Sequence, residues 1–241
     1  MNTSTKSILI VDADSNTRQS LAINLRCLGY KVFLSTNGNI AIKTINKEDI
    51  SLVILDILLP TLDGYEVCNQ IRKVSSIPII ILTALGNISS QVMGLELGAD
   101  DFIIKPCSLK EIEVRIKSNL RRSNYQNGKV KILPVRQEIF YFGNLTVNLT
   151  TKKVLKNNKQ LILTELEFSL LQLLIQNSGC KLSRATILDN IWGYTPERDI
   201  DTRVVDVHIH RLRSKLEENP KTPDFILTAR GIGYMFQTLN L

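Results

Sequence analysis

The sequence predicts two domains: an α/β domain built on a doubly wound, five-stranded parallel sheet, and a smaller α+β domain behind it. In the first half, short apolar runs alternate with segments of helical periodicity, which is typical of a parallel sheet with crossover helices. In the second half, short strands precede three helices and a terminal hairpin. With 241 residues, the chain is long enough for both domains. We expect them at residues 1–122 and 139–241, joined by a polar linker at residues 123–138.

Five apolar runs predict the strands of the parallel sheet. They lie at residues 7–11, 31–34, 52–55, 77–82 and 100–104. Helices are expected between and after them, at residues 15–28, 40–45, 65–72, 89–97 and 109–120, the first capped by Ser15. The run at 52–55 is apolar throughout, which indicates a strand buried on both faces. Pro60 and the pair Asp63-Gly64 then turn the chain into the next helix.

Polar residues follow four of these strands: Asp12 with Asp14, Asp56, Thr83 and Lys105. Each one alone has a plain structural explanation, as a helix cap or a solvated loop residue. In a doubly wound sheet, however, the carboxyl ends of the strands converge on one crevice. An acid pair that holds a metal, with a hydroxyl and an amine that hold phosphoryl oxygens, suits phosphoryl transfer to a carboxylate.

On these residues, the segment 6–122 resembles the receiver domain of two-component response regulators, which has a flavodoxin-like fold. The resemblance implies that Asp56 is the phosphoacceptor and that the Lys105-Pro106 bond is cis. It also implies supporting roles for the other crevice residues: Asp12 and Asp14 in the acid pocket that binds Mg²⁺ together with Asp56, Thr83 and Phe102 in the switch, and Lys105 at the phosphate.

One departure from the family pattern concerns Ala13, which stands where the family has the carboxylate that ligates Mg²⁺ directly. Because Mg²⁺ uses only one or two protein carboxylates, Asp12 and Asp56 can suffice, or Asp14 can reach in. The alternative is a degenerate receiver in a regulator that works without phosphorylation. A remote alternative is a haloacid-dehalogenase-type phosphatase. The run Asp12-Ala13-Asp14 resembles the first sequence motif of these enzymes. That motif has Thr or Val two residues after its second Asp, where this chain has Asn16. The phosphatase alternative also gives no role to Asp56.

The second half is organised around its third predicted helix, at about residues 202–217. Val205, Ile209, Leu212 and Leu216 form an apolar stripe, and cationic residues cover most of the remainder. Asp206 is the only acid between Arg203 and Leu216. A solvated charged face is common, but a cationic helix in third place fits a recognition helix for the DNA major groove. Before it, Thr164 with Glu167 predicts a capping box, and Ser183 predicts a second helix cap.

This half resembles the winged helix-turn-helix domain of OmpR/PhoB-type regulators. The match rests on Trp192-Gly193, on residues 203–216 and on the run Arg230-Gly231-Ile232-Gly233-Tyr234. The whole chain therefore resembles an OmpR/PhoB-family regulator, and its sequence is most similar to those of cyanobacteria and red-algal plastids. The resemblance implies that Arg211 reads a base and that Arg230 enters the minor groove. The remaining DNA contacts it implies, all to the backbone, are Trp192, Arg203, His208, His210, Arg213 and Tyr234.

The partners follow from the same resemblance: promoter DNA, a sensor histidine kinase, RNA polymerase and a second copy of the chain. The net charge of +7 is compatible with an anionic partner. The residues that match the family's dimer face are Asp100, Asp101, Glu111 and Arg115. The four scattered cysteines indicate neither a disulfide framework nor a zinc site. We expect a transcriptional regulator rather than an enzyme, outside the membrane, in the cytoplasm or in the plastid stroma if plastid-encoded.

Overall fold

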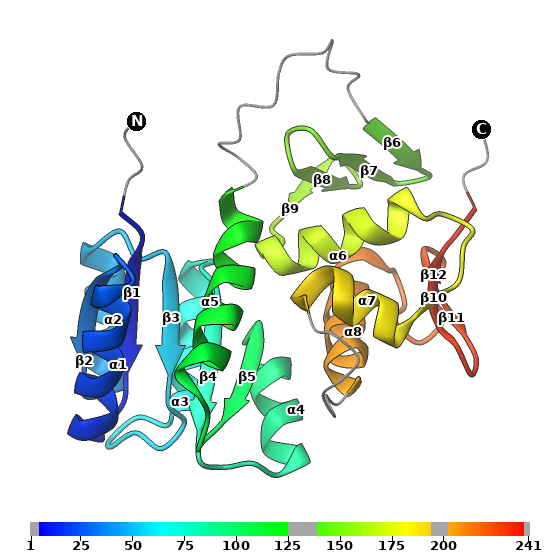
Figure 1. Cartoon of the computed structure of the whole chain (residues 1–241). Helices are drawn as coiled ribbons and strands as arrows, with labels where there is room; N and C mark the ends of the chain where they lie inside the picture. Colours follow the sequence, from blue (N-terminus) through cyan, green and yellow to red (C-terminus); the bar gives the residue numbers. More distant parts are fainter. Residues whose placement is uncertain (1–4, 125–138, 194–201, 239–241) are drawn as a thin grey trace. The chain divides into compact units, whose positions relative to one another are not determined.

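The computed structural model describes residues 5–124, 139–193 and 202–238. The chain forms two compact units, Met1–Arg121 and Arg122–Leu241, which are considered separately below (Figure 1). Most of the predicted linker at 123–138 lies outside the described residues. The same is true of residues 194–199, where the sequence predicts a loop before the third helix of the second half. No helix in the described parts of the chain is long and apolar enough to cross a bilayer.

Unit 1 is a parallel sheet with strand order β2-β1-β3-β4-β5, which confirms the predicted doubly wound architecture. Its strands are β1 (Ser7–Val11), β2 (Lys31–Ser35), β3 (Leu52–Leu55), β4 (Ile79–Thr83) and β5 (Asp101–Ile104). Every residue of β1, β3 and β4 is buried, as expected for strands covered on both faces. β4 begins two residues later than predicted, after Pro78, which has no N–H to donate to a ladder.

Helices cover both faces of this sheet (Figure 1). They are α1 (Ser15–Cys27), α2 (Gly38–Lys47), α3 (Gly64–Val74), α4 (Ile88–Glu96) and α5 (Leu109–Asn124). Leu25 of α1 and Ile116 of α5 belong to one buried cluster with Ile10 and Ile54 of the sheet. α4 packs on the opposite face, where Gly94 leaves room for the side chain of Ile81. The carboxyl edge of the sheet is thereby left for the polar residues.

The start of α1 corrects one prediction. Its N-cap is Asp14 and not Ser15, because the Asp14 carboxylate accepts a hydrogen bond from the Thr17 N–H at 2.8 Å. The two residues are equally good caps by type. The choice is fixed by the preceding turn, in which the Asp14 N–H donates to Oδ1 of Asp12 at 2.8 Å.

Unit 2 combines two antiparallel sheets with three helices. β6 (Ile139–Phe142), β7 (Leu145–Asn148), β8 (Lys153–Lys156) and β9 (Lys159–Leu161) form a meander. The helices are α6 (Glu165–Gln176), α7 (Arg184–Trp192) and α8 (Arg203–Leu216). β11 (Ile226–Ala229) and β12 (Gly233–Phe236) form the predicted hairpin, and β10 (Leu182–Ser183) adds a third strand beside β12. The predicted capping box of Thr164 and Glu167 is present.

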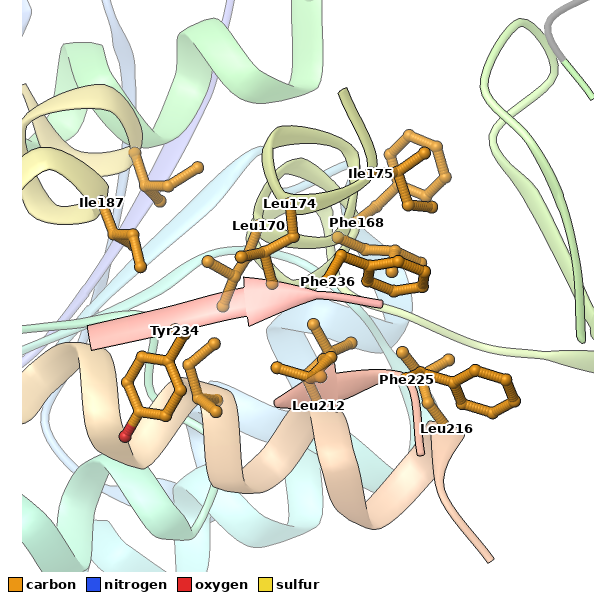
Figure 2. Close-up of a cluster of buried hydrophobic side chains, with 14 of the residues drawn as sticks. Phe168, Leu170, Leu174, Ile175, Ile187, Leu212, Leu216, Phe225, Tyr234 and Phe236 are labelled. Carbon is orange, nitrogen blue, oxygen red and sulfur yellow. The ribbon is translucent and has the colours of Figure 1, made fainter. Parts of the chain in front are cut away.

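The core of unit 2 lies between α6, α8 and the hairpin (Figure 2). Leu170 and Leu174 of α6 face Phe236 of β12, and Leu212 and Leu216 of α8 close the cluster from the other side. The predicted apolar stripe of α8 is therefore part of its buried face, which also includes His208, and Arg203, His210 and Ser214 are exposed.

Candidate functional site

Two of the polar residues predicted to share a crevice in unit 1, Asp12 and Asp56, are brought together around Lys105. Its Nζ lies 2.7 Å from Oδ2 of Asp12 and 2.6 Å from Oδ2 of Asp56. Both carboxylates are buried. Burial acts to lower the pKa of Lys105, but hydrogen bonds and charge from the two aspartates outweigh it, so the pKa lies above its ordinary value. The amine therefore stays cationic between two carboxylates.

The turn after β3 fixes the orientation of Asp56. Its Oδ1 accepts a hydrogen bond from the Leu58 N–H at 3.0 Å, which leaves Oδ2 to Lys105. Asp63 caps α3, and Gly64 begins that helix directly against the turn. A Cβ at Gly64 would lie 2.3 Å from the Asp56 carbonyl oxygen and 2.6 Å from the Ile57 Cα. The predicted Asp63-Gly64 turn thus allows the close approach that holds the carboxylate in place.

Asp14, by contrast, does not join Lys105. Its carboxylate caps α1, and the hydroxyl and N–H of Thr17 lower its pKa. Arg18 lies beside Ala13, the position at which the family has a carboxylate. Its Nη1 donates to the carbonyl oxygens of Asp12 at 2.6 Å and Ala13 at 3.2 Å. Among the described residues, no group of three His, Cys, Asp or Glu side chains could hold a metal ion. Asp12 and Asp56 remain as a pair of carboxylates, which is within the number that Mg²⁺ uses.

The two predicted switch residues are inside the fold. Thr83 is fully buried, and its Oγ1 accepts a long hydrogen bond of 3.4 Å from the Leu85 N–H. Phe102 is buried beside α4, where its ring edge would lie 3.5 Å from a Cβ placed on Gly94. The Lys105-Pro106 peptide bond is cis, as predicted.

The charged residues predicted for a dimer face make their contacts within the chain. Arg115 pairs with Asp101 at 2.7 Å and with Glu111 at 3.1 Å. Asp100 is buried, pairs with Arg72 at 2.5 Å and accepts a hydrogen bond from the Ile79 N–H at 2.8 Å. The carboxylate of Asp100 therefore supports the receiver interior, and the dimer contact stays a prediction.

The cationic residues predicted for DNA binding fall into two groups by exposure. Arg203 and His210 are exposed on α8, and Arg230 is exposed at the tip of the hairpin. Arg211 and Arg213 are partly buried, with Arg213 donating to the Ile226 carbonyl oxygen through Nε at 3.0 Å and Nη2 at 2.6 Å. Burial lowers the pKa of Arg213.

The other predicted DNA contacts lie beneath this surface. Trp192 and His208 are buried, with ring centroids 5.2 Å apart. Tyr234 is buried at the start of β12, and its hydroxyl donates to Oδ1 of Asp206 at 2.7 Å. Trp192 and Tyr234 therefore contact buried or polar side chains of α8, His208 and Asp206, and the predicted contacts of all three predicted residues with the DNA backbone stay predictions.

Glu167 is a functional candidate that the sequence showed only as a helix cap. Its Oε2 accepts hydrogen bonds from the Thr164 N–H at 2.8 Å and from Lys215 Nζ at 2.6 Å. Its Oε1 lies 3.3 Å from Nη2 of Arg211. The carboxylate is fully buried, so it fixes the base-reading candidate Arg211 against α6. The available signal was the spacing of Arg211 and Lys215, one turn apart on α8.

Comparison with known proteins covers both units. A family described as the response regulator receiver domain matches residues 8–117. A second family, described as the C-terminal domain of transcriptional regulatory proteins, matches residues 158–236. The chain is 51% identical over 240 residues to the protein of Cyanophora paradoxa named probable transcriptional regulator ycf27, with 100% of both chains covered. The protein of the same name from Pyropia yezoensis is 48% identical over 239 residues, covering 99% of this chain and 98% of its own.

Solved structures agree with this assignment. The response regulator DrrB of Thermotoga maritima, described as an OmpR/PhoB homologue, is 31% identical with a TM-score of 0.50, covering 97% of this chain and 99% of its own. A mutant of RitR is 26% identical with a TM-score of 0.73, covering 97% of this chain and 100% of its own. The relatives are named as regulators and not as enzymes, so the phosphatase alternative is set aside. With a receiver fold in front of a winged-helix domain, the chain belongs to the OmpR/PhoB family of response regulators.

Proposed function

We propose that this DNA-binding response regulator is switched by phosphorylation of Asp56 by a sensor histidine kinase. The observation that carries the proposal is the arrangement at Lys105, whose amine lies within 2.7 Å of both Asp12 and Asp56. A carboxylate nucleophile beside a fixed cation is suited to accept a phosphoryl group, because the cation balances the charge on the transferred oxygens.

In this mechanism, Oδ2 of Asp56 attacks the phosphorus of the kinase phosphohistidine, and the bond from phosphorus to the histidine nitrogen breaks. Lys105 exchanges its contact with Asp56 for one with a phosphoryl oxygen and keeps Asp12 as its partner. The Thr83 hydroxyl then turns from Leu85 towards the phosphoryl group. Asp12 and Asp56 would hold Mg²⁺, which supplies charge neutralisation when bound.

Asp56→Asn is expected to abolish the phosphoryl adduct that forms when the full chain is incubated with acetyl phosphate and Mg²⁺. The amide oxygen of Asn is a poor nucleophile, and the substitution leaves the size of the side chain unchanged. Intact-mass spectrometry measures the adduct directly. Asp14→Asn serves as the control and should keep the adduct, because Asp14 is engaged in capping α1. An adduct that persists on Asp56→Asn would show that another residue is phosphorylated.

A second candidate function is DNA binding without phosphorylation, and the observation that favours it is the acid pocket. Ala13 supplies no carboxylate, and the Asp14 carboxylate faces Thr17. Ala13→Asp is therefore expected to tighten Mg²⁺ binding by about tenfold or more, because it adds a charged oxygen ligand. Isothermal titration with MgCl₂ would measure the change. If the natural chain forms no adduct yet binds promoter DNA, and Ala13→Asp restores the adduct, the phosphorylation-independent function is the correct one.

The proposed output is binding to promoter DNA through α8 and the β11–β12 hairpin. The exposed residues Arg203 and His210, with the partly buried arginines of α8, match a recognition helix in the major groove, and Arg230 at the hairpin tip matches a minor-groove contact. Phosphorylation would favour a homodimer, which places two such surfaces on neighbouring half-sites. Contact with RNA polymerase would follow at the promoter, in the cytoplasm or in the plastid stroma if the chain is plastid-encoded.

Arg211→Ala is expected to weaken binding to a selected DNA site by about 1–3 kcal/mol if Arg211 reads a base. On random DNA, the loss should be smaller, since a base contact contributes only at the right sequence. Fluorescence anisotropy of labelled duplexes measures both affinities. Arg211→Lys is the matched variant: it keeps the charge beside Glu167 but loses the bidentate fork, so it should also relax specificity. Equal losses on both duplexes would instead make Arg211 a phosphate contact.

A further inference from the structure

Asp206 is an unexpected residue at its position in α8. It is the only acid of the helix and lies in its first turn, between the exposed residues Arg203 and His210. A carboxylate on a surface that meets DNA phosphates opposes binding through charge repulsion. Its side chain is 38% exposed, so burial does not remove that repulsion. Its contacts suggest a role that compensates for this cost.

The carboxylate of Asp206 joins three elements of unit 2. Its Oδ1 accepts a hydrogen bond from Nε of Arg184, the first residue of α7, at 2.7 Å. The same oxygen accepts a hydrogen bond from the hydroxyl of Tyr234, on β12, also at 2.7 Å. Figure 2 shows the Tyr234 ring beside β12, with its hydroxyl oxygen directed away from the strand. Oδ1 of Asp206 on α8 thus binds both α7 and the β11–β12 hairpin, which is the wing of this domain.

A second contact from α8 reaches the same part of the hairpin. Nη2 of Arg213 donates to Oγ1 of Thr228 on β11 at 2.9 Å. Thr228 and Tyr234 form one pair, or rung, of the hairpin ladder. Asp206 and Arg213, both on α8, therefore bind the same rung of the hairpin. The guanidinium carbons of Arg184 and Arg213 also lie 5.1 Å and 5.4 Å from the Tyr234 ring centroid.

The Tyr234 hydroxyl is a dependable donor in this arrangement. Burial, followed by the hydrogen bond and charge of Asp206, raises the pKa of Tyr234 to about 12. The phenol therefore keeps its proton at every pH at which DNA binding is measured.

We propose that Asp206 is a positioning residue that ties the wing to the recognition helix, so that Arg230 and the cations of α8 meet DNA as one rigid surface. The inference rests on the proposed DNA-binding function. Arg230 sits at the tip just beyond the gripped rung, and its place relative to α8 depends on the angle of the hairpin. Without the tie, Arg230 would have to be ordered at the moment of binding, which reduces its contribution to affinity.

The proposal predicts that loss of the Asp206 charge has opposite effects on two quantities: the affinity for random DNA, and the contribution of the hairpin to DNA affinity. Asp206→Asn removes a repulsive charge, so binding to random DNA should stay equal or become tighter. The affinity contributed by the wing should fall, because the weakened contact no longer fixes the hairpin. Tyr234→Phe breaks the same contact with no change of charge and should lower the wing contribution in the same way. The pair of variants therefore separates geometry from electrostatics.

The test measures dissociation constants of the full chain for a duplex that the full chain has selected from a random pool. Arg230→Ala is expected to weaken binding by about tenfold in the natural chain. In the Asp206→Asn and Tyr234→Phe backgrounds, the same substitution should weaken it by about threefold or less, a loss of coupling that a double-mutant cycle reports. Asp189→Asn is the matched control: it removes one charge from the exposed side of α7, and the tenfold effect of Arg230→Ala should remain.

Hydrogen exchange without DNA provides the second measurement. Amides of residues 226–236 should exchange faster in Asp206→Asn and Tyr234→Phe, while those of α6 stay protected. The proposal is overturned if the Arg230→Ala effect is the same in all backgrounds, if it is absent in the natural chain, or if hairpin exchange is unchanged. If the natural chain selects no duplex from the random pool, the DNA-binding function fails, and the exchange data still decide whether Asp206 holds the hairpin.

Discussion

Arg72→Met is expected to destabilise the receiver unit by about 3–5 kcal/mol, because it leaves a buried carboxylate without its cation. Arg72 donates to Asp100 Oδ2 at 2.5 Å, to the Gly98 carbonyl oxygen at 2.7 Å and to the Ile77 carbonyl oxygen at 2.5 Å. The side chains of the pair are only 12% and 3% exposed, so water screens them little. The substitution leaves in place the hydrogen bond from the Ile79 N–H to the Asp100 carboxylate.

Hydrogen exchange of the β4 amides in the full chain measures this loss, since β4 is an interior strand in which every residue is buried. Lys110→Met is the matched control, as it removes a cation from an ion pair whose lysine is 75% exposed, and it should change stability by no more than about 0.5 kcal/mol. Adding Asp100→Leu to Arg72→Met should recover part of the stability, because the stranded carboxylate is then removed. A loss below about 1 kcal/mol for Arg72→Met would show that the buried pair contributes little.

Glu217→Ala is expected to destabilise unit 2 by at least about 3 kcal/mol, because three backbone N–H groups lose one common acceptor. The carboxylate is 3% exposed and follows α8 directly. Its oxygens accept hydrogen bonds from Asp224 N at 2.9 Å, Phe225 N at 3.1 Å and Ile226 N at 2.8 Å. These three residues lead into β11, so the substitution should loosen the start of the hairpin first.

The single tryptophan of the chain, Trp192, is buried in unit 2, so its fluorescence during urea unfolding reports on this unit. Glu218→Ala is a close control, because Glu218 is the next residue but is 65% exposed and pairs with Lys156 at 3.3 Å. That substitution should cost no more than about 0.5 kcal/mol. Glu217→Gln should lie between the two, as it keeps acceptor capacity without the charge. Equal midpoints for the Glu217 and Glu218 variants would contradict the assigned role.

Much of the fold was predictable, because local patterns and long-range packing agree. The run Leu52–Leu55 is apolar in every position and becomes a strand buried on both faces. The stripe Val205, Ile209, Leu212 and Leu216 becomes the buried side of α8. β10 was missed, since two residues carry no alternation and the strand exists only through its pairing with β12.

The crevice was predictable for a different reason: strand ends in a parallel sheet must share an edge, which brings Asp12, Asp56 and Lys105 together. Contacts between distant residues on other surfaces follow no such rule. Nothing in the spacing of Arg72 and Asp100 shows that they pair, or that Asp206 meets Tyr234. Asp14 shows a further limit, because a carboxylate can serve a pocket or a helix end, and only the backbone path decides.

The amine of Lys105, placed between two carboxylates, would affect which cations the crevice can bind. Lys105 already neutralises one of the two charges of Asp12 and Asp56, at hydrogen-bonding distance from both. A monovalent cation that displaced it would bring no additional charge and would lose these hydrogen bonds. A divalent cation would bring one positive charge more than the amine that it displaces. Competition with Lys105 would therefore favour divalent over monovalent cations, before any selection by ion size. In this chain, Asp12 and Asp56 would hold the incoming ion, and Lys105 would compete with it for these two carboxylates.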